Sequence, residues 1–407
     1  MTAGYDPVAR ATGLDVATFA ATYWGRQPLL RRATDLPSEG FTDLLDLDAV
    51  DELVSRRGLR TPFLRMAKEG DVLGSGRFTR GGGAGAEISD QAADDKVLAE
   101  FAAGATLVLQ GLHRMWPPVI DYAAVLATQL GHPVQVNAYI TPSQNTGFAP
   151  HYDVHDVFVL QFAGRKRWRI HEPVLTAPLR DQPWDARREA VAQRAAEEPV
   201  LDVVLEPGDA LYLPRGYLHA ASALGEVSGH LTIGVQPVTR AFLAEQVLGA
   251  LSDDPELRVS LPAGADLTDP AVLESELKAT RTALHTAIDR LSDERVARAV
   301  SGHLERRTRP APISPLAQLS AAAALTPSDV VRLRAGLRYS LTRDGGQFAL
   351  RAMERTTTVP ARLEPALTRL LGGDPVRLAD LSELDEADAL TLVRRLLREG
   401  IVVPDPR

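Results

Sequence analysis

The chain of 407 residues contains no cysteine. This absence excludes disulfides, thiolate zinc sites and thiol nucleophiles together, so any bound metal must use nitrogen and oxygen ligands. The sequence also lacks an uninterrupted apolar run of roughly 18 residues, and its first residues lack a charged region followed by an apolar stretch. We therefore expect a cytoplasmic protein that makes no membrane contact.

Basic residues are not in excess over acidic residues either. The net charge is -8, whereas 45% of the residues are hydrophobic and 24% are charged, which is typical of a folded globular protein. This charge balance does not provide the broad basic surface that nonspecific nucleic-acid binding requires. Lysine is scarce, because it supplies only four of the 45 basic residues, at positions Lys68, Lys96, Lys166 and Lys278.

Short alternating apolar runs separated by turn signals occupy the middle of the chain, from about 134 to 238. Several strands at this spacing predict a β-sandwich or β-barrel. Residues 162–165 (FAGR) predict a hairpin turn, and residues 206–209 (EPGD) predict a second turn. Upstream, the segment 15–31 predicts an amphipathic helix that starts at Asp15 and whose pattern Pro28 ends. The glycine-rich residues 80–86 predict a flexible surface loop.

Helical patterns return between about 240 and 305, and a long paired-helix segment after a barrel favours dimerisation. Residues 307–315, rich in proline and charge, predict a linker. Residues 316–407 combine helical patterns with a small hairpin, which predicts a winged helix. Its candidate helices are not basic, so a protein contact is at least as well supported as DNA binding.

His151 and Asp153 are separated by one residue in APHYDVHD. This spacing places both side chains on one face of an extended segment, where they can meet a single ion. A non-haem iron(II) site needs two imidazoles and one carboxylate on one side of the metal. His219 fits as the second imidazole. The Pro-Gly-Asp turn starts an apolar strand, and Pro214–Gly216 then bends the chain so that the residues after the bend, including His219, are presented to the site.

Two further histidines compete for the third ligand position. His155 has the same parity as His151, but a straight strand would carry it roughly 13 Å beyond that residue. His230 opens an apolar strand and fits a cavity-lining position better than a ligand position. An HxD triplet alone is a weak signal, so the case for a metal depends on its surroundings.

Lys166 strengthens that case, because it shares one strand face with Trp168 and Ile170. An inward ammonium is costly to bury unless it meets an anion, and no acidic neighbour is evident in the adjoining strand. The distal carboxylate of 2-oxoglutarate would supply that anion. Asn137 and Tyr139 share a face of their own strand and can add hydrogen bonds to the same carboxylate.

Three segments carry a specific resemblance to a known family: NAYITPSQNTGFAPHYDVHDVFVLQFAGRKRWRI, EPGDALYLPRGYLHAA and HLTIG. Together they resemble the JmjC-type ribosomal oxygenases, also called the cupin-4 group. The resemblance extends to YWGRQPLLRR near the N-terminus, to the central helices and to the C-terminal segment. Almost the whole chain thus follows the three-part plan of this family.

The resemblance implies an α+β fold whose double-stranded β-helix (JmjC/cupin) barrel and N-terminal helical extension occupy residues 1–238. Residues 239–306 would form a helical dimerisation region, and residues 316–407 a winged-helix-like domain. The implied ligands are His151, Asp153 and His219 for Fe(II), and Lys166 with Asn137 for the co-substrate 2-oxoglutarate; Tyr139 and Thr232 lie in matching strands.

The implied activity is O2-dependent hydroxylation of a histidine or arginine side chain of a ribosomal protein by a homodimer. Val154-His155-Asp156 and the 80–86 loop depart from the family pattern, which leaves substrate choice open. Alternatives are a 2-oxoglutarate oxygenase acting on another protein or a small molecule, including N-methyl demethylation, and a non-catalytic cupin sensor with a DNA-binding winged helix. A manganese or zinc cupin enzyme would leave Lys166 unexplained.

Overall fold

The structure is a computed structural model that describes residues 6–37, 40–68, 70–143 and 149–405. The chain divides into two compact units, Met1–Pro237 and Val238–Arg407. Each unit is described by itself below. Within the described residues, no helix is both long enough and apolar enough to cross a membrane.

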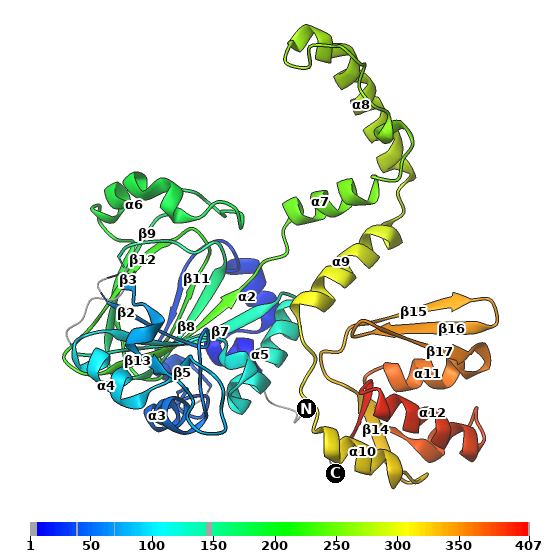
Figure 1. Cartoon of the computed structure of the whole chain (residues 1–407), viewed down its shortest axis with the longest axis horizontal. Coiled ribbons are helices and arrows are strands. Elements are labelled where there is room, and N and C mark those ends of the chain that lie inside the picture. The colour runs from blue at the N-terminus through cyan, green and yellow to red at the C-terminus, as the bar shows by residue number, and fades with distance from the viewer. Residues whose placement is uncertain (1–5, 38–39, 69, 144–148, 406–407) are drawn as a thin grey trace. The chain divides into compact units, whose positions relative to one another are not determined.

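The first unit is built on two antiparallel sheets (Figure 1). The larger sheet, in spatial order, contains β1 (Leu29–Arg31), β11 (Ala210–Leu213), β8 (Asp156–Ala163), β13 (Ser228–Val235), β7 (Val134–Thr141), β6 (Thr106–Leu109), β2 (Leu64–Lys68) and β3 (Asp71–Val72). The smaller sheet contains β10 (Leu201–Leu205), β9 (Lys166–His171) and β12 (Leu218–Ala223). A separate pair is formed by β4 (Thr79–Arg80) and β5 (Gln91–Ala92).

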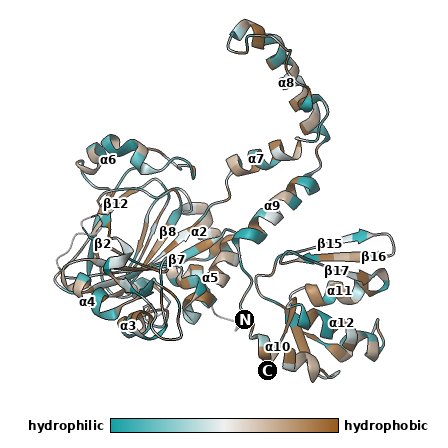
Figure 2. Ribbon diagram, viewed as in Figure 1, coloured by the Kyte–Doolittle hydropathy of each residue, from teal (hydrophilic) through white to brown (hydrophobic). Residues whose placement is uncertain are grey.

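Helices cover the outer face of the larger sheet. These helices are α1 (Pro7–Thr12), α2 (Val16–Thr22), α3 (Leu47–Arg56), α4 (Asp94–Ala102) and α5 (Pro117–Leu130). The remaining helix, α6 (Arg188–Ala195), belongs instead to a small buried cluster with Tyr152 and Leu218. The main core combines outward side chains such as Phe158 and Ile233 with Phe19 of α2 and Leu126 of α5. Figure 2 shows the apolar character that runs along β7 and β8, whereas α6 is largely hydrophilic.

The inner face of the larger sheet meets the smaller sheet. Val159 of β8 and Leu211 of β11 belong to one buried cluster with Trp168 and Ile170 of β9. Because both faces of β8 are covered, nearly its whole length is buried, and after Asp156 its sequence is an apolar run interrupted only by Gln161. The predicted barrel therefore takes the form of two facing sheets.

The turn at 162–165 differs from the hairpin that its sequence predicts. β8 pairs with β11 and β13, whereas β9 pairs with β10 and β12, so the turn carries the chain from one sheet to the other. The turn at 206–209 makes the return crossing from β10 to β11. Repeated crossing winds the strands into the predicted double-stranded β-helix, and local turn chemistry cannot reveal which strand will be the partner.

The helix predicted from Asp15, with its pattern ending at Pro28, is shorter in the structure. Only Val16–Thr22 is helical, with Asp15 as the N-cap, and Leu29–Arg31 instead pairs with the edge of β11. Gly25, at φ 65°, breaks the helical path, and its amide donates to the Tyr212 hydroxyl at 2.8 Å. The glycine-rich segment 80–86 is a largely exposed loop outside regular structure after Arg80, as its sequence predicts.

Gly164 in the crossing turn gives a first stability prediction. Its φ of 55° is left-handed, and a Cβ built there would lie 2.1 Å from the Val227 carbonyl oxygen. Gly164→Ala should therefore destabilise the first unit by more than about 3 kcal/mol, because backbone strain and a backbone clash add. Gly225, at φ 76° with nothing near its Cβ position, is the matched control.

Gly225→Ala carries the left-handed strain without the clash, so it should cost only about 1 kcal/mol. Urea unfolding followed by tryptophan fluorescence measures both variants in the first unit, because all four tryptophans lie there. If both variants lost the same free energy of unfolding, the predicted backbone clash at Gly164 would be wrong.

The second unit begins with the helices α7 (Arg240–Ala250), α8 (Pro270–Arg290) and α9 (Asp293–Arg307), which match the predicted helical segment. After residues 308–314, which lack regular structure, come α10 (Pro315–Ala323), β14 (Val330–Leu333), β15 (Tyr339–Asp344), β16 (Gln347–Ala352), β17 (Arg355–Pro360), α11 (Glu364–Leu371), β18 (Val376–Arg377), α12 (Glu386–Arg398) and β19 (Val402–Pro404). These later elements enclose a hydrophobic core of their own.

Candidate active site

The three residues predicted as metal ligands lie together. An isolated antiparallel bridge joins the two histidine segments, with the His219 amide donating to the His151 carbonyl at 2.8 Å. The amide of Gly216 donates to the Asp153 carbonyl at 3.0 Å. The two imidazole centroids are 4.4 Å apart, and one ligand atom from each of the three side chains lies within 4.8 Å of the others.

Both imidazoles are oriented by their own backbone. Nδ1 of His151 donates to the Ala149 carbonyl at 2.8 Å, and Nδ1 of His219 donates to the Tyr217 carbonyl at 3.2 Å. These bonds fix the tautomer in which Nε2 is an acceptor. Nε2 of His219 lies 3.6 Å from an Asp153 carboxylate oxygen. The site therefore offers two imidazole nitrogens and one carboxylate, the donor set that suits Fe(II) with open positions.

The charges at the site favour the metal-binding protonation states. Burial lowers the pKa of His219 to about 4, with a further contribution from His151, so its imidazole is neutral at pH 7. Loss of bulk water raises the pKa of Asp153, but His155, His219 and His151 together outweigh this effect and hold the pKa below its usual value. Asp153 is therefore ionised at neutral pH.

The two competing histidines have other contacts. Within the described part of the chain, the one cluster that could hold a metal is His151, Asp153 and His219, which leaves out His155 and His230. Nε2 of His155 lies 3.1 Å from the side-chain nitrogen of Gln135. The buried ring of His230 stacks on Tyr139 with centroids 5.3 Å apart.

Lys166 is buried, as its strand parity predicts, with 3% of the residue exposed. Its Nζ donates to the Thr141 hydroxyl at 3.0 Å, and no carboxylate of the described residues makes an ion pair with it. Burial lowers the pKa of Lys166 to about 7. A buried amine with one neutral partner points to an anionic ligand that completes its surroundings.

The other predicted co-substrate residues share the inner face of the larger sheet. In the β7–β13 register Asn137 is opposite Thr232, and Tyr139 is opposite His230. The Asn137 side-chain oxygen accepts from the Gly111 amide at 3.0 Å, which orients the side chain. Burial raises the pKa of Tyr139, which keeps the phenol protonated. Polar groups thus gather on the wall that faces Lys166.

Thr141 is the site residue that sequence reasoning missed. It is fully buried and has the same parity as Asn137 and Tyr139 in β7, so its direction was readable from the sequence. Its hydrogen bond to Lys166 joins strands of different sheets, and spacing along the chain does not encode that contact.

The mouth of the site is bordered by α6 and the segment before it. The Trp184 ring lies 6.2 Å from the His151 ring, and the Arg188 guanidinium lies 5.2 Å above the Trp184 ring. These two side chains, with Ala149 and Pro150, line a small depression of about 410 Å³. An aromatic and apolar rim of this kind can hold a side chain or peptide segment beside the predicted ligands.

Comparison with known proteins identifies a JmjC domain over residues 118–243. Ribosomal oxygenase 1 of Rattus norvegicus is 39% identical over 172 residues, which are 40% of this chain and 28% of that protein. Ribosomal oxygenase 1 of Homo sapiens is 28% identical over 95% of this chain and 65% of its own length. The bifunctional lysine-specific demethylase and histidyl-hydroxylase NO66 of Culex quinquefasciatus is 26% identical over 90% of this chain and 53% of its length.

The chain thus spans less than two thirds of the length of these curated relatives. Among solved structures, Escherichia coli ycfD has a TM-score of 0.57 at 19% identity, covering 96% of this chain and 98% of that one. The ribosomal oxygenase YcfD in complex with cobalt and 2-oxoglutarate has a TM-score of 0.53 at 18% identity, covering 97% and 99%. At this identity the likeness establishes the fold, which extends over nearly the whole chain.

Proposed function

We propose that this chain is an Fe(II)- and 2-oxoglutarate-dependent oxygenase that hydroxylates a protein side chain. The observation that carries the proposal is the pairing of two features in one barrel: a two-histidine, one-carboxylate cluster and, on the strand next to that of His219, a buried lysine without a carboxylate partner among the described residues. Metal binding alone would leave Lys166 unexplained. The JmjC domain and the named relatives support the same reaction.

His151, Asp153 and His219 would hold the metal, and Lys166 would bind the distal carboxylate of 2-oxoglutarate. Asn137, Tyr139 and Thr232 would complete the co-substrate pocket by donating hydrogen bonds from the opposite wall. Bound Fe(II) would couple dioxygen reduction to the decarboxylation of 2-oxoglutarate to succinate and to hydroxylation of the substrate.

The chain would also position the metal ligands and enclose the co-substrate. The backbone bonds to each imidazole keep Nε2 directed at the cluster, and the Gly216 amide fixes the segment that carries Asp153. The buried rings of Trp168 and His230, whose centroids are 5.4 Å apart, exclude water from the region around Lys166. A dry, oriented pocket strengthens the ionic contact with the co-substrate.

The proposed substrate is a histidine or arginine side chain of a ribosomal protein, because the relatives are named ribosomal oxygenases and histidyl-hydroxylases. This substrate also fits the proposed cytoplasmic location. The test is succinate formation by the purified chain with Fe(II), ascorbate and 2-oxoglutarate, with and without oxygen and ribosomal-protein peptides. We expect oxygen-dependent succinate and a peptide that gains the mass of one oxygen atom.

A peptide that instead loses a methyl group would favour demethylation, and turnover of a small molecule alone would contradict the protein substrate. Specific DNA binding without succinate would favour the sensor alternative.

We further propose the three-part organisation 1–238, 239–306 and 316–407, with the helical part forming a homodimer and the last part a winged-helix-like domain. The unit boundary after Pro237 supports the first division. Leu243, Leu248, Leu277 and Ile288 of α7 and α8 are 40–55% exposed, which supports a partner for these helices. Sedimentation of the full chain measures the oligomeric state, and a monomer at micromolar concentration would contradict this part.

Thr141 supplies a prediction within the co-substrate pocket. Thr141→Val keeps the shape but removes the only side-chain oxygen that Lys166 contacts in the described structure. We expect the KM for 2-oxoglutarate to rise about tenfold, because one hydrogen bond that orients the ammonium is lost. Thr232→Val is the comparison on the neighbouring strand. An unchanged KM in Thr141→Val would show that Lys166 is oriented without this hydroxyl.

A further inference from the structure

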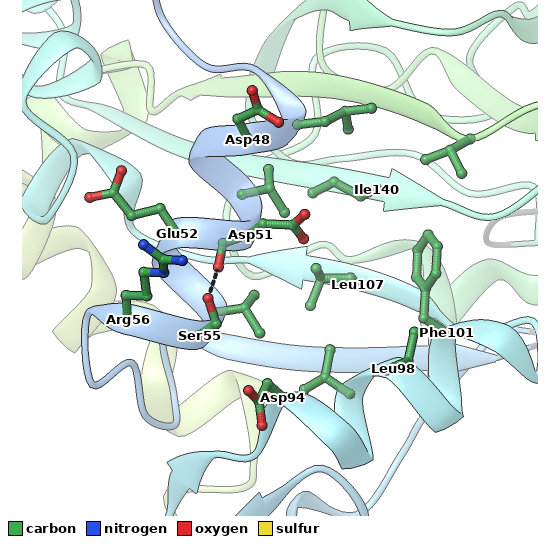
Figure 3. Close-up of a pocket in the computed structure, with 15 residues that line it drawn as sticks. Asp48, Asp51, Glu52, Ser55, Arg56, Asp94, Leu98, Phe101, Leu107 and Ile140 are labelled. Atoms are coloured by element: carbon green, nitrogen blue, oxygen red, sulfur yellow. Dashed lines mark hydrogen bonds between the residues drawn. The ribbon is translucent and has the colours of Figure 1, made fainter.

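A second concave surface lies on the outer face of the larger sheet. Helices α3 and α4 border a groove of about 930 Å³ whose floor includes Leu107 of β6 and Ile140 of β7 (Figure 3). These two residues are opposite each other in the β6–β7 register. Since strand side chains alternate, Ile140 points away from the face that carries Tyr139 and Thr141. The groove therefore shares no residue with the candidate active site.

The floor and one wall of the groove are apolar. Val50 and Val97 are buried beside Leu107 and Ile140, and Phe101 of α4 packs partly against the same core. Leu98 of α4 is 68% exposed at the edge of this floor. Figure 3 shows Leu98 and Phe101 projecting from α4 on one side of the groove. An occupant could therefore bury apolar surface that the folded chain leaves in contact with water.

The rim of the groove is acidic. Asp48, Asp51 and Glu52 of α3 and Asp94 of α4 line it, whereas Arg56 is the one basic residue among its lining residues. Glu52 pairs with Arg57, but none of the three aspartates makes an ion pair with a described residue.

The helix dipole accounts for two of these carboxylates. Asp48 and Asp94 occupy the first turns of their helices, where a negative charge is favourable. Asp51 lies beyond the first turn of α3, so the dipole does not explain it. Because Glu52 is paired with Arg57, three carboxylates against the guanidinium of Arg56 leave the rim with a net negative charge over an apolar floor.

We propose that this groove docks a cationic amphipathic segment of a partner polypeptide. Apolar side chains of that segment would cover Leu98 and fill the groove, while lysines and arginines would meet Asp48 and Asp51. Charge complementarity selects this occupant, because the same carboxylates repel nucleic acid and anionic lipid and would be desolvated without partners under a purely apolar segment. The inference goes beyond the proposed reaction and does not depend on it.

The test is fluorescence anisotropy of the full chain with a labelled synthetic peptide that carries leucines at helical spacing and lysines between them. We expect roughly micromolar binding that weakens as salt is added. Two comparison peptides have the same leucines, one with glutamate in place of lysine and one with the sequence scrambled. Neither should bind measurably.

Variants of the chain locate the contact. Asp48→Asn with Asp51→Asn should weaken binding about fivefold, since two exposed ion pairs are lost. Leu98→Ser should weaken it about tenfold, because one leucine is no longer buried. Glu274→Gln with Asp374→Asn removes two exposed charges from the second unit and should leave binding unchanged.

Succinate formation, measured on the same variants, should stay at the wild-type level, which separates this proposal from the oxygenase proposal. The docking proposal is overturned if the wild-type chain does not bind the lysine peptide, if the glutamate peptide binds as well, or if the Asp48/Asp51 and Leu98 variants bind like wild type. Far-UV circular dichroism and thermal unfolding of each variant confirm that the fold is intact before binding is compared.

Discussion

Asp153→Ala should abolish succinate formation and weaken metal binding by more than about a hundredfold, since second-shell changes alone cost ten- to a hundredfold. Removal of Asp153 leaves two imidazoles and no carboxylate, so the site loses both a ligand atom and its negative charge. The fold should survive, because a third of the Asp153 side chain is exposed and its contact with the neutral imidazole of His219, at 3.6 Å, is not an ion pair at pH 7. Calorimetric titration with Co(II) gives the affinity, and succinate gives the turnover.

Two further variants make this prediction specific. Asp153→Asn keeps the size of the side chain but removes its charge, so it should lose turnover as fully as the alanine variant. Asp185→Ala removes an exposed carboxylate next to Trp184, at the mouth of the site, and should keep metal binding and turnover. Turnover near the wild-type rate in either Asp153 variant would remove that residue from the ligand set.

The sequence predicts the local parts of this site because their geometry depends on short spacing. His151 and Asp153 need only the two-residue period of an extended chain to reach one ion, and the same period predicts that Lys166 is buried with Trp168. Strand order is less accessible. The 162–165 turn has the composition of a hairpin, yet it links strands of different sheets.

Contacts that join distant segments account for the remaining differences. Leu29–Arg31 forms a strand because it pairs with the edge of β11, and β11 lies about 180 residues further along the chain. Thr141 joins the pocket because Lys166 reaches it across the space between two sheets. In both cases the residue has an ordinary local pattern, and its role follows from a partner that periodicity cannot identify.

Lys166→Met should have two opposite effects: the chain loses 2-oxoglutarate binding and gains stability. Without the ammonium, the distal carboxylate would be buried unpaired, which should weaken binding about a hundredfold or more. In the ligand-free chain, the same ammonium destabilises the folded state, because burial disfavours its charged form and lowers its pKa to about 7. Replacing it with an uncharged side chain of similar length should stabilise the ligand-free first unit by on the order of 3 kcal/mol near neutral pH.

The pH dependence of this gain has a definite sign. Between pH 7 and the unfolded pKa of 10.5, the unfolded chain binds one proton at Lys166 that the folded chain does not. Wild-type stability therefore rises with pH across this window, and the destabilisation is fully present below it. The advantage of Lys166→Met should be largest near pH 6 and should disappear as the pH approaches 10.5. The lost Thr141 hydrogen bond offsets about 1 kcal/mol of it.

Urea unfolding of metal-free chain at several pH values, followed by tryptophan fluorescence, measures this difference in the first unit, and calorimetry with Fe(II) replaced by Co(II) measures 2-oxoglutarate affinity. Lys278→Met, which removes an exposed lysine from α8, should change neither quantity. A Lys166 variant that binds 2-oxoglutarate normally would end the co-substrate assignment, and a stability difference that does not change with pH would show that the amine is solvated. Both expected results together would mean that the chain keeps a costly buried charge because its ligand needs it.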